Sequence, residues 1–548
     1  MNQAWLQNYN PLGNAALSTI VATIPVALLF YFLAVRRTKA YLAAIYGLAA
    51  AVLSSLIVFR MPAHMVAGAV STGVAYGVIR IAWVLWAAVF VYELTVETGY
   101  FEVIKASIGG ITGDRRLQVL LIAFAFGALL EGSGGGGAPV AITGAMMVGI
   151  GFDPFQTAIM CLIANSAPVA YGGMGNPIRT LVAVTGLPEA DLSAMVGRIL
   201  PLTTLVLPFY IIRIQAKTRQ VLAVWPGLLA CGITFGGIQF FWSNYMDASL
   251  VDIVGGMGTL LGLALFFRVW QPKEVWRYPG ETAASTQMKR YNKLQILHAW
   301  SPFLLLGLFV VVWGVPSVAR TLERTSFKFT VPGLHQQVIR HAPVVVKDFA
   351  EPATIDVAWL SGVGTATALA GFVAGPLLGL SLKRTLLVFF RTFRQLRFSL
   401  IAIIAMMGLG FLTRYSGMDA VMGLAMARTG VLFPMFGTLI GWLGVALSGT
   451  DAGSNALFGS LQTMTANQLG ISPVLMAAAN SAGGVMGKMI AAQSLIVGCA
   501  AVGQAGREGD LFRAVFKHSI ILAILIGLIV TMYAYVFPGA VPSGHRFW

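Results

Sequence analysis

The sequence predicts an all-α polytopic membrane protein whose helices form two inverted repeats with interrupted or re-entrant segments. Three observations support this fold class: a mean hydropathy of +0.80, a charged fraction of only 10% over 548 residues, and a polar glycine-rich motif that occurs once in each half. A soluble domain needs many more polar side chains to cover its surface. The formal net charge of +16 indicates basic loops that set topology and meet anionic lipid, so we expect no nucleic-acid partner.

Apolar stretches of spanning length recur along the whole chain. Because about 20 residues cross a bilayer as a helix, we expect about 12 to 14 transmembrane helices. The first stretch is too long for a removable signal peptide and should stay as an anchor. The predicted stretches are 12–35, 41–59, 65–92, 117–130, 155–171, 194–212, 221–241, 253–267, 297–315, 357–380, 398–412, 431–447, 474–492 and 520–536.

Lys and Arg gather in five segments, and all five are cytoplasmic if the N-terminus is periplasmic. The segments are 36–39, 213–219, 268–293, 383–397 and 507–517. In residues 383–397 the basic side chains alternate with apolar ones, so we expect this segment along the inner interface. The topology divides the chain into a first transmembrane half (1–267), a basic cytoplasmic linker (268–296) and a second transmembrane half (297–548) with an external loop at 316–356.

The glycine-rich motif reads GALLEGSGGGGAP from Gly127 and GVALSGTDAGSNA from Gly444. The first copy precedes NSAPVAYGGMGNP from Asn165, and the second precedes NSAGGVMGKM from Asn480. On the predicted topology the two copies enter the membrane from opposite sides, which makes the repeats inverted. Irregular backbone is tolerated in hydrocarbon only where it is buried in protein or lines a wet cavity, so these breaks indicate the substrate site of a transporter.

In the first copy Glu131 precedes an almost unbroken glycine run. Each Gly costs a helix about 1 kcal/mol relative to Ala, so the helix should break there. The break exposes backbone N–H groups around Ala138, and such a helix N-terminus attracts anions. We assign Ser133 and Gly135 to substrate binding and Glu131 to proton coupling. The alternative is a flexible interfacial loop in which Glu131 reaches water.

The second copy is richer in polar side chains. A charged carboxylate inside the membrane costs about a few kcal/mol or more, so Asp451 should be protonated, ion-paired or bound to a cation. We assign Asp451 to proton coupling and Thr450, Ser454 and Asn455 to substrate binding. The alternative is that Asp451 caps the N-terminus of its own helix, a role compatible with the first.

Two Asn-Ser pairs and one lysine complete the candidate site. The pairs Asn165-Ser166 and Asn480-Ser481 end apolar helices, where their amides and hydroxyls suit a carboxylate or hydroxyl group; close helix packing is the alternative reading. Lys488 is an isolated cation, and we expect it to pair with Asp451 or with an anionic substrate. The alternative is that its side chain extends to the membrane surface. We assign all five residues to substrate binding.

The sequence contains no nucleotide-binding or protease motif, and its three cysteines are widely spaced. Walker A, GxGxxG after a strand, HExxH and a GxSxG elbow are all missing, so the sequence lacks the residues that ATP hydrolysis or proteolysis requires. We therefore expect a transporter driven by an ion gradient, with no enzymatic activity, cofactor or metal site.

These motifs resemble the bacterial lactate permeases over nearly the whole chain. The resemblance runs from WLQNYNPLGN at Trp5 through LEGSGGGGAPVAIT, NSAPVAYGGMG, GWLGVALSGTDAGSNALFGSLQ and AANSAGGVMGKMI to the C-terminus. It implies secondary transport of L-lactate, D-lactate or glycolate with protons across the inner membrane, on inverted repeats with re-entrant hairpins. The sequence departs from the family pattern at five positions. Ser133, Gly134 and Gly136 replace two alanines and a phenylalanine. Asn176 replaces an apolar residue, and Arg414 replaces an asparagine.

We therefore expect a symporter that imports a small 2-hydroxymonocarboxylate with H⁺ as the coupling ion. A sodium-coupled or dicarboxylate carrier is the alternative within transport, and a membrane subunit of a proton-translocating enzyme is the alternative from another class. The expected partners are the monocarboxylate substrate and membrane lipid. The sequence leaves open whether the chain is a monomer or a homo-oligomer.

Overall fold

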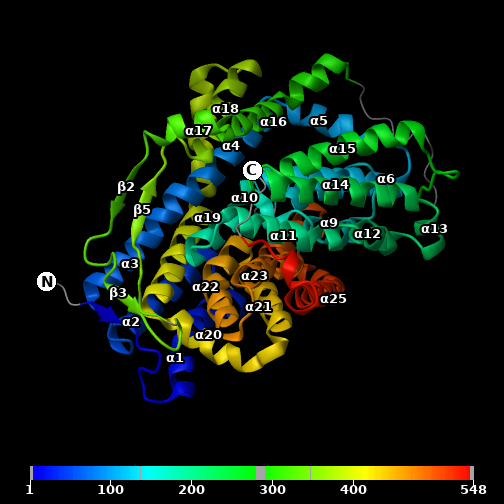
Figure 1. Cartoon of the computed structure of the whole chain (residues 1–548). Coiled ribbons are helices and arrows are strands. Elements are labelled where there is room, and N and C mark those ends of the chain that lie inside the picture. Colours follow the sequence, from blue (N-terminus) through cyan, green and yellow to red (C-terminus); the bar gives the residue numbers. More distant parts are fainter. Residues whose placement is uncertain (1–3, 37, 135–137, 279–290, 346, 544–548) are drawn as a thin grey trace.

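The computed structural model describes residues 4–36, 38–134, 138–278, 291–345 and 347–543. Figure 1 shows helices packed side by side through the body of the molecule, with strands confined to one edge. This arrangement confirms the predicted all-α fold class. The strands are β1 (Trp5–Leu6), β2 (Phe327–Thr330), β3 (Val338–Arg340), β4 (Phe349–Ala350) and β5 (Thr354–Val357).

The helices of the first half are α1 (Ala15–Phe30), α2 (Ala40–Ile57), α3 (Ala63–Tyr76), α4 (Trp83–Glu97), α5 (Tyr100–Gly109), α6 (Arg115–Val119), α7 (Gly127–Ser133), α8 (Ala138–Gly149), α9 (Pro154–Asn165), α10 (Gly172–Thr185), α11 (Glu189–Thr204), α12 (Leu207–Gln215), α13 (Thr218–Leu222), α14 (Trp225–Tyr245) and α15 (Val251–Val269). Those of the second half are α16 (Lys293–Gly314), α17 (Pro316–Glu323), α18 (Val363–Leu377), α19 (Leu382–Ser416), α20 (Met418–Met426), α21 (Phe433–Ser448), α22 (Asp451–Leu469), α23 (Pro473–Gly487), α24 (Ala492–Ala501) and α25 (Glu508–Tyr535).

Among the described residues, nine helices are long and apolar enough to cross a membrane, and the number is eleven if two bent helix pairs are each one span. π-Helical turns join some of the shorter helices, so that α3 continues into α4 as one helix of 35 residues. The chain also has three shorter apolar helices, at Ala15–Phe30, Pro139–Gly149 and Val363–Leu377. The predicted count of about 12 to 14 is reached only when these shorter helices are included.

Helix α19 differs from the sequence prediction. Residues 383–397 do not form a separate interfacial segment, because they continue into the spanning part as one helix of 35 residues. Neither Gly nor Pro occurs before Gly408, so nothing interrupts the helix. At 1.5 Å per residue it is about 52 Å long, well beyond the roughly 30 Å of a hydrocarbon core. Its basic part is held to α4, where Arg391 lies 2.6 Å from Glu97.

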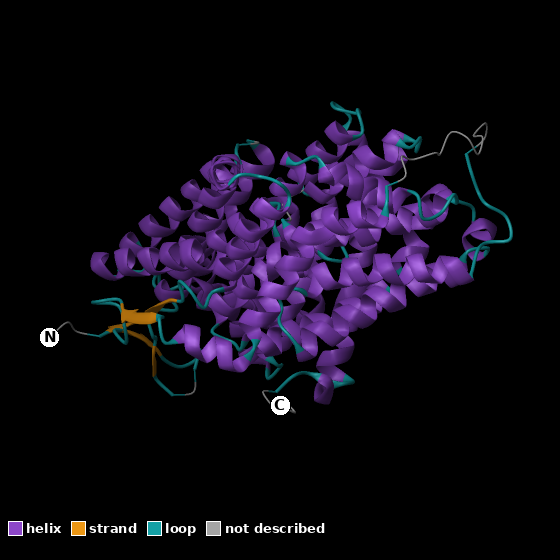
Figure 2. Cartoon of the chain, turned by 90° about the horizontal axis from the view of Figure 1, so that it is seen from above, coloured by secondary structure: helices purple, strands orange, loops and turns teal. Residues whose placement is uncertain are grey.

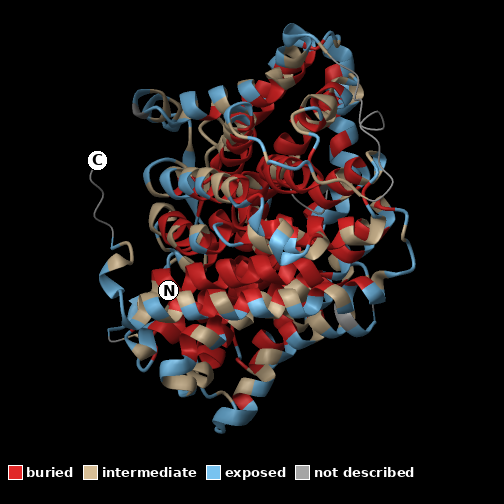
Figure 3. Cartoon of the chain, turned by 90° about the vertical axis from the view of Figure 1, so that its right-hand side faces the viewer, coloured by how far each residue is buried: buried red, intermediate tan, exposed pale blue. Residues whose placement is uncertain are grey.

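The outer surface of the helical body is largely apolar. Figure 3 shows the buried residues concentrated in the interior and exposed residues around the periphery. On α16 the exposed side chains include Leu297, Leu308 and Val311. A continuous apolar surface of this kind suits lipid rather than water. The chain is therefore a multi-pass membrane protein.

The predicted external loop at 316–356 contains α17 and four of the strands. Strands β2 and β5 are antiparallel, as are β3 and β4, while β1 from the N-terminus joins β3 in parallel. Figure 2 shows these strands at the edge of the molecule that carries the N-terminus. The segment is fastened to the end of α19 by Glu351, which is 2.9 Å from Arg414 and also pairs with Arg340.

The two halves of the chain meet at the site region. Helix α10 of the first half packs against α22 of the second, and α22 packs in turn against α21 and α23. Helix α10 also packs against α7, which packs in turn against α15. These contacts bring the glycine-rich motif of each half into one neighbourhood.

Candidate functional site

The first helix break lies where the glycine run predicts it, but it begins two residues later. Helix α7 continues through Gly132 to Ser133, and the backbone leaves the helix at Gly134. The predicted site residue Gly135 lies outside the described residues, and α8 begins at Ala138. The hydroxyl of Ser133 donates to the carbonyl oxygen of Leu129 at 2.8 Å, so it is bonded within its own helix.

The second break is short. Helix α21 ends at Ser448, Gly449 adopts a left-handed conformation with φ of +81°, and α22 begins at Asp451. Thr450 is the N-cap, because its hydroxyl accepts the N–H of Gly453 at 3.0 Å. The alternative assignment of Asp451 as the N-cap is therefore wrong, and residues 451–453 are helical rather than irregular.

Glu131 is buried, with an exposed fraction of 4%. The side-chain amide of Asn165 donates to Glu131 Oε2 at 2.9 Å. The other carboxyl oxygen lies directly over Gly172, where a Cβ atom would be 2.7 Å from Oε1. Glu131 thus lies inside the protein against two segments of the first half rather than extending to the surface, while residues 135–137 of the predicted loop lie outside the described residues.

Asp451 is held in a similar way in the second half. Its Oδ2 accepts hydrogen bonds from the hydroxyl of Ser481 and, at 3.5 Å, from the amide of Asn455. Its Oδ1 has no hydrogen-bond partner among the described residues and lies over Gly484, where a Cβ would be 2.3 Å away. In each half, therefore, a carboxyl group contacts one member of the Asn-Ser pair, Asn165 in the first and Ser481 in the second, and a glycine that follows it.

A network of amides lies behind Asp451. Asn480 donates to Asn455 Oδ1 at 2.8 Å and to Ser454 Oγ at 3.3 Å, and it accepts from Gln462 at 3.1 Å. Ser454 in turn donates to the carbonyl oxygen of Gly441 at 3.1 Å. The sequence predicts Ser454, Asn455 and Asn480 as substrate contacts. In this structure they bond to one another and support Asp451.

Lys488 lies at the end of α23 and is 3% exposed. Its ammonium group donates to the carbonyl oxygen of Gly449 at 2.6 Å, which ties it to the second break. It also interacts electrostatically with both Glu131 and Asp451. A lysine that reached the membrane surface would not be buried in this way, so the snorkelling alternative is wrong.

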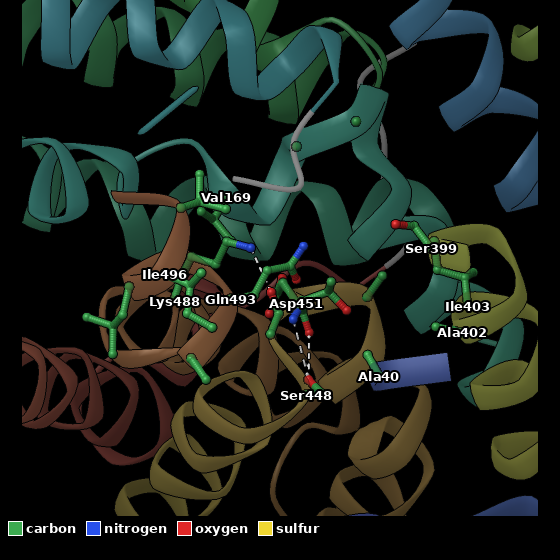
Figure 4. A pocket seen from close by; sticks show the side chains of 18 of the residues that line it. Ala40, Val169, Ser399, Ala402, Ile403, Ser448, Asp451, Lys488, Gln493 and Ile496 are labelled. Atoms are coloured by element: carbon green, nitrogen blue, oxygen red, sulfur yellow. Dashed lines mark hydrogen bonds between the residues drawn. The ribbon is translucent and has the colours of Figure 1, made fainter. Parts of the chain in front are cut away.

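A cavity of about 1710 Å³ lies between the two breaks. It is far larger than the roughly 30 Å³ that one water occupies in the liquid, so it has room for a small carboxylate and water. Figure 4 shows Lys488, Gln493 and Asp451 close together on one wall, with Ser399, Ala402 and Ile403 of α19 across from them.

The cavity separates the predicted site residues into two groups. Four of them line it: Glu131, Thr450, Asp451 and Lys488. The remaining described ones lie behind its wall: Ser133, Asn165, Ser166, Ser454, Asn455, Asn480 and Ser481. Among these, Ser166 donates to the carbonyl oxygen of Ile163 at 2.7 Å, within its own helix. Their assignment to substrate binding stays a prediction.

Of the polar residues of the cavity wall that were not assigned to the site from the sequence, two lie beside helix breaks. Asn176 follows the glycine-rich kink in α10, and its Oδ1 is buried with no hydrogen-bond partner among the described residues. Gln493 lies in the first turn of α24. Both follow a break in a predicted apolar helix, and that position is the signal by which they could have been found.

The mouth of the cavity carries charges of both signs, since Glu93 and Glu508 line it as well as Lys39 and Arg513. Lys39, Gln395 and Arg513 are exposed and line it, and they come from α2's leading loop, α19 and α25. Each lies in one of the basic segments that the sequence predicts to be cytoplasmic. The cavity therefore opens at the end of the molecule that carries three of those segments.

Comparison with known proteins identifies the family. A profile described as L-lactate permease matches residues 18–537. The chain is 43% identical to "Glycolate permease GlcA" of Escherichia coli K12, 40% to "L-lactate permease" of Bacillus subtilis 168 and 41% to "L-lactate permease" of Salmonella typhimurium. Each of these alignments covers 98% of this chain and 100% of the relative.

The structure search finds the YdaH transporter of Alcanivorax borkumensis, with a TM-score of 0.42 and 14% identity over 84% of this chain and 86% of that one. The family assignment depends on the sequence relatives alone, which match from end to end. Permeases are transporters, so a membrane subunit of an enzyme is excluded. The chain belongs to the L-lactate permease family and is a multi-pass membrane transporter.

Proposed function

We propose that this transporter imports a small 2-hydroxymonocarboxylate, namely L-lactate, D-lactate or glycolate, by proton symport across the bacterial inner membrane. The names of its relatives, which are glycolate and L-lactate permeases, support this substrate class. The observation that carries the proposal is that two carboxyl groups and one ammonium group, those of Glu131, Asp451 and Lys488, meet on the wall of one cavity.

The charges of these groups favour symport over uniport of the anion. With both carboxyls ionised, the three groups carry one net negative charge before substrate enters. An anionic substrate adds a second, and two like charges about 4 Å apart repel by about 4 kcal/mol at an effective dielectric constant of about 20. A proton that enters with the substrate removes this repulsion, so binding of the two is coupled.

We infer that the substrate carboxylate lies between Lys488 and the start of α24. Ala492 and Gln493 line the cavity there, and Ala491 gives the first N–H groups of α24 no side-chain cap. Such a helix N-terminus favours an anion. The amides of Gln493 and Asn176 then suit the 2-hydroxyl group. In this proposal Asn165 and Ser481 do not contact the substrate. They position the carboxyl groups of Glu131 and Asp451, to which they donate hydrogen bonds.

We propose the topology that the basic segments predict, with a periplasmic N-terminus and a cavity that opens to the cytoplasm. The test uses single cysteines introduced at Asp348, in the external segment, and at Lys39, at the cavity mouth. The native cysteines are all buried, so the background is low. An impermeant maleimide added to whole cells should label D348C and not K39C. The reverse pattern would invert the topology.

We also propose that the two halves are inverted repeats. The support is local: each half contains a helix break, a carboxyl group at that break, and an Asn-Ser pair of which one member contacts the carboxyl together with a following glycine. An experimental structure tests this directly. It should relate Gly134 to Gly449 by a pseudo-two-fold axis in the membrane plane, whereas an axis normal to the membrane would contradict the proposal.

Uptake of radiolabelled lactate and glycolate into proteoliposomes tests substrate and coupling together. An imposed pH gradient, acidic outside, should drive accumulation in sodium-free buffer. Accumulation that requires a sodium gradient and ignores the pH gradient would favour the sodium-coupled carrier. Stronger competition from a small dicarboxylate than from unlabelled lactate would favour a dicarboxylate carrier.

A further inference from the structure

Asp252 is a carboxyl group that the site described so far does not include. It lies in the first turn of α15 and is fully buried. Neither of its carboxyl oxygens has a hydrogen-bond partner among the described residues. A buried polar group without a partner is rare in native proteins and needs an explanation.

Asp252 packs directly against the helix that carries Glu131. A Cβ atom on Gly132 would be 2.8 Å from Asp252 Cβ and 2.9 Å from the backbone nitrogen of Ile253. One turn further along, a Cβ on Gly256 would be 2.7 Å from the carbonyl oxygen of Ala125. The two glycines thus allow the helix of Glu131 and α15 to touch, and Asp252 lies against Gly132, the residue that follows Glu131 in the chain.

Within the described part of the chain, no cation pairs with Asp252. Arg179 of α10 is directed elsewhere, because its guanidinium donates to Met174 O and Ser249 Oγ. The hydroxyl of Tyr171 donates to Ser193 O at 2.6 Å. Tyr245, at the end of α14, is exposed. An isolated carboxylate at such a position is strongly unfavourable, so Asp252 holds a proton in this conformation.

Asp252 lies on the face of α7 that is turned away from the cavity. Leu130, Glu131 and Gly134 line the cavity and Asp252 does not. Successive helical residues project about 100° apart, so Gly132, which contacts Asp252, points about 200° away from Leu130. The chain reaches the surface shortly before Asp252, since Met246 is exposed. Asp252 therefore lies between Glu131 and the α14–α15 loop.

We propose that Asp252 is a proton-relay residue that connects Glu131 to the water at the α14–α15 loop. Because no direct hydrogen bond joins the two carboxyls, the proton of the Asp252 carboxyl passes to the Glu131 carboxylate through a bridging water. Asp252 then regains a proton from water at the loop. Glu131 then releases its proton into the cavity. On the proposed topology the loop is periplasmic and the cavity mouth cytoplasmic, so the path runs inward. This inference rests on the proposed proton symport.

The test compares Asp252→Asn with wild type in proteoliposomes that contain a trapped pH dye. Asn has the shape of the neutral acid but carries no exchangeable acid proton. Lactate-driven acidification of the lumen and pH-driven accumulation should both fall at least about tenfold, as for loss of a positioned proton-transfer group. Lactate counterflow, which needs no net proton movement, should stay within about twofold of wild type. Asp252→Glu should restore acidification, and Asp348→Asn, at an exposed carboxylate of the external segment, is the matched control.

The outcomes separate the relay from the proposed function. If wild type itself shows no pH-driven accumulation, proton symport is wrong and the relay with it. If wild type accumulates lactate and Asp252→Asn does so equally well, only the relay is overturned. Asp252→Leu is a second neutral variant that needs no hydrogen bond and should behave like Asp252→Asn. If neither neutral variant yields folded protein by size exclusion, Asp252 has a structural role and the relay is also overturned.

Discussion

The two helix breaks each present one carboxyl group to the cavity, but they hold it differently. At the first break Glu131 accepts a hydrogen bond from one side chain, that of Asn165. At the second break Asp451 accepts from Ser481 and Asn455, and the amide network of Asn480 continues behind them. Because a well-connected buried network is rigid, the Asp451 carboxyl, which accepts more hydrogen bonds from described residues than that of Glu131, is the more firmly held of the two.

This difference indicates that the two halves have different roles in transport. The second break combines a fixed carboxyl with Lys488, whose ammonium group bonds to the break itself. That combination suits the recognition of an anion. The first break combines a sparsely held carboxyl with the unpartnered Asp252 on the neighbouring helix, and that combination suits proton movement. The following changes test this division.

Replacement of Lys488 by Met should have the largest effect. It removes the buried cation that offsets two carboxyls, and we expect a loss of at least about 3 kcal/mol, or about 100-fold in kcat/KM for lactate. Lys488→Arg should recover only part of the activity, because a guanidinium does not fit the position of an ammonium group. Initial uptake rates measure both. Lys383→Met, at an exposed lysine of α19, is the control, and normal uptake by Lys488→Met would remove the lysine from the site.

Neutralising the two carboxyls should separate coupling from exchange. Glu131→Gln should lose pH-driven accumulation by about tenfold or more and keep counterflow, because exchange needs no net proton. Asp451→Asn should reduce accumulation less than Glu131→Gln does, because the proposed relay delivers its proton to Glu131 and not to Asp451. Accumulation and counterflow of labelled lactate are measured side by side, with the exposed Glu323→Gln as control. Normal accumulation in both variants would show that neither carboxyl carries the proton.

The serines of the two Asn-Ser pairs offer a matched comparison. Ser481 donates to Asp451, whereas Ser166 donates to a carbonyl oxygen of its own helix. A hydrogen bond to a charged group contributes about 1.5 to 3 kcal/mol, so Ser481→Ala should lower the initial uptake rate about tenfold. Ser166→Ala should stay within about twofold. Equal effects of the two substitutions would mean that the halves do not differ as proposed.

Much of this arrangement follows from sequence patterns. Hydropathy predicted 297–315 where α16 spans Lys293–Gly314, and the glycines at 134 and 449 mark both breaks. Such features are local, since helix propensity and apolar length decide them within one segment. The segment 383–397 was misread because its basic pattern also suits an interfacial helix, whereas its uninterrupted helical propensity extends α19.

The contents of the site were harder to predict because they depend on packing. Asn455 and Asn480 lie in polar motifs, but only the approach of α22 to α23 turns them toward each other rather than toward the cavity. Asp252 belongs to no motif. Its role follows from its contact with Gly132, which is far away in the sequence, and a single sequence carries no signal for such a contact.

The smallest expected effect concerns how the cavity reads the substrate's hydroxyl group. Asn176 stands where the resemblance to the lactate permeases leads us to expect an apolar residue. Its Oδ1 is buried at the cavity wall and has no hydrogen-bond partner among the described residues. Polar groups that match a 2-hydroxyl are left unpaired by an analogue that lacks it, so such a site discriminates well. In wild type, lactate should therefore compete with labelled lactate at least about tenfold better than propionate does.

Asn176→Leu should reduce the preference for lactate over propionate by about threefold, which corresponds to the loss of one neutral hydrogen bond. The rate of glycolate counterflow should change by no more than about twofold. The measurement is the ratio of inhibition constants of lactate and propionate in both proteins, with Ser399→Ala on the opposite wall as control. If propionate competes as well as lactate in wild type, the cavity does not read the hydroxyl. If the ratio is unchanged in Asn176→Leu, the contact is assigned to Gln493, the amide of the cavity wall at the start of α24 close to Lys488. Selectivity then belongs to the second half together with anion binding.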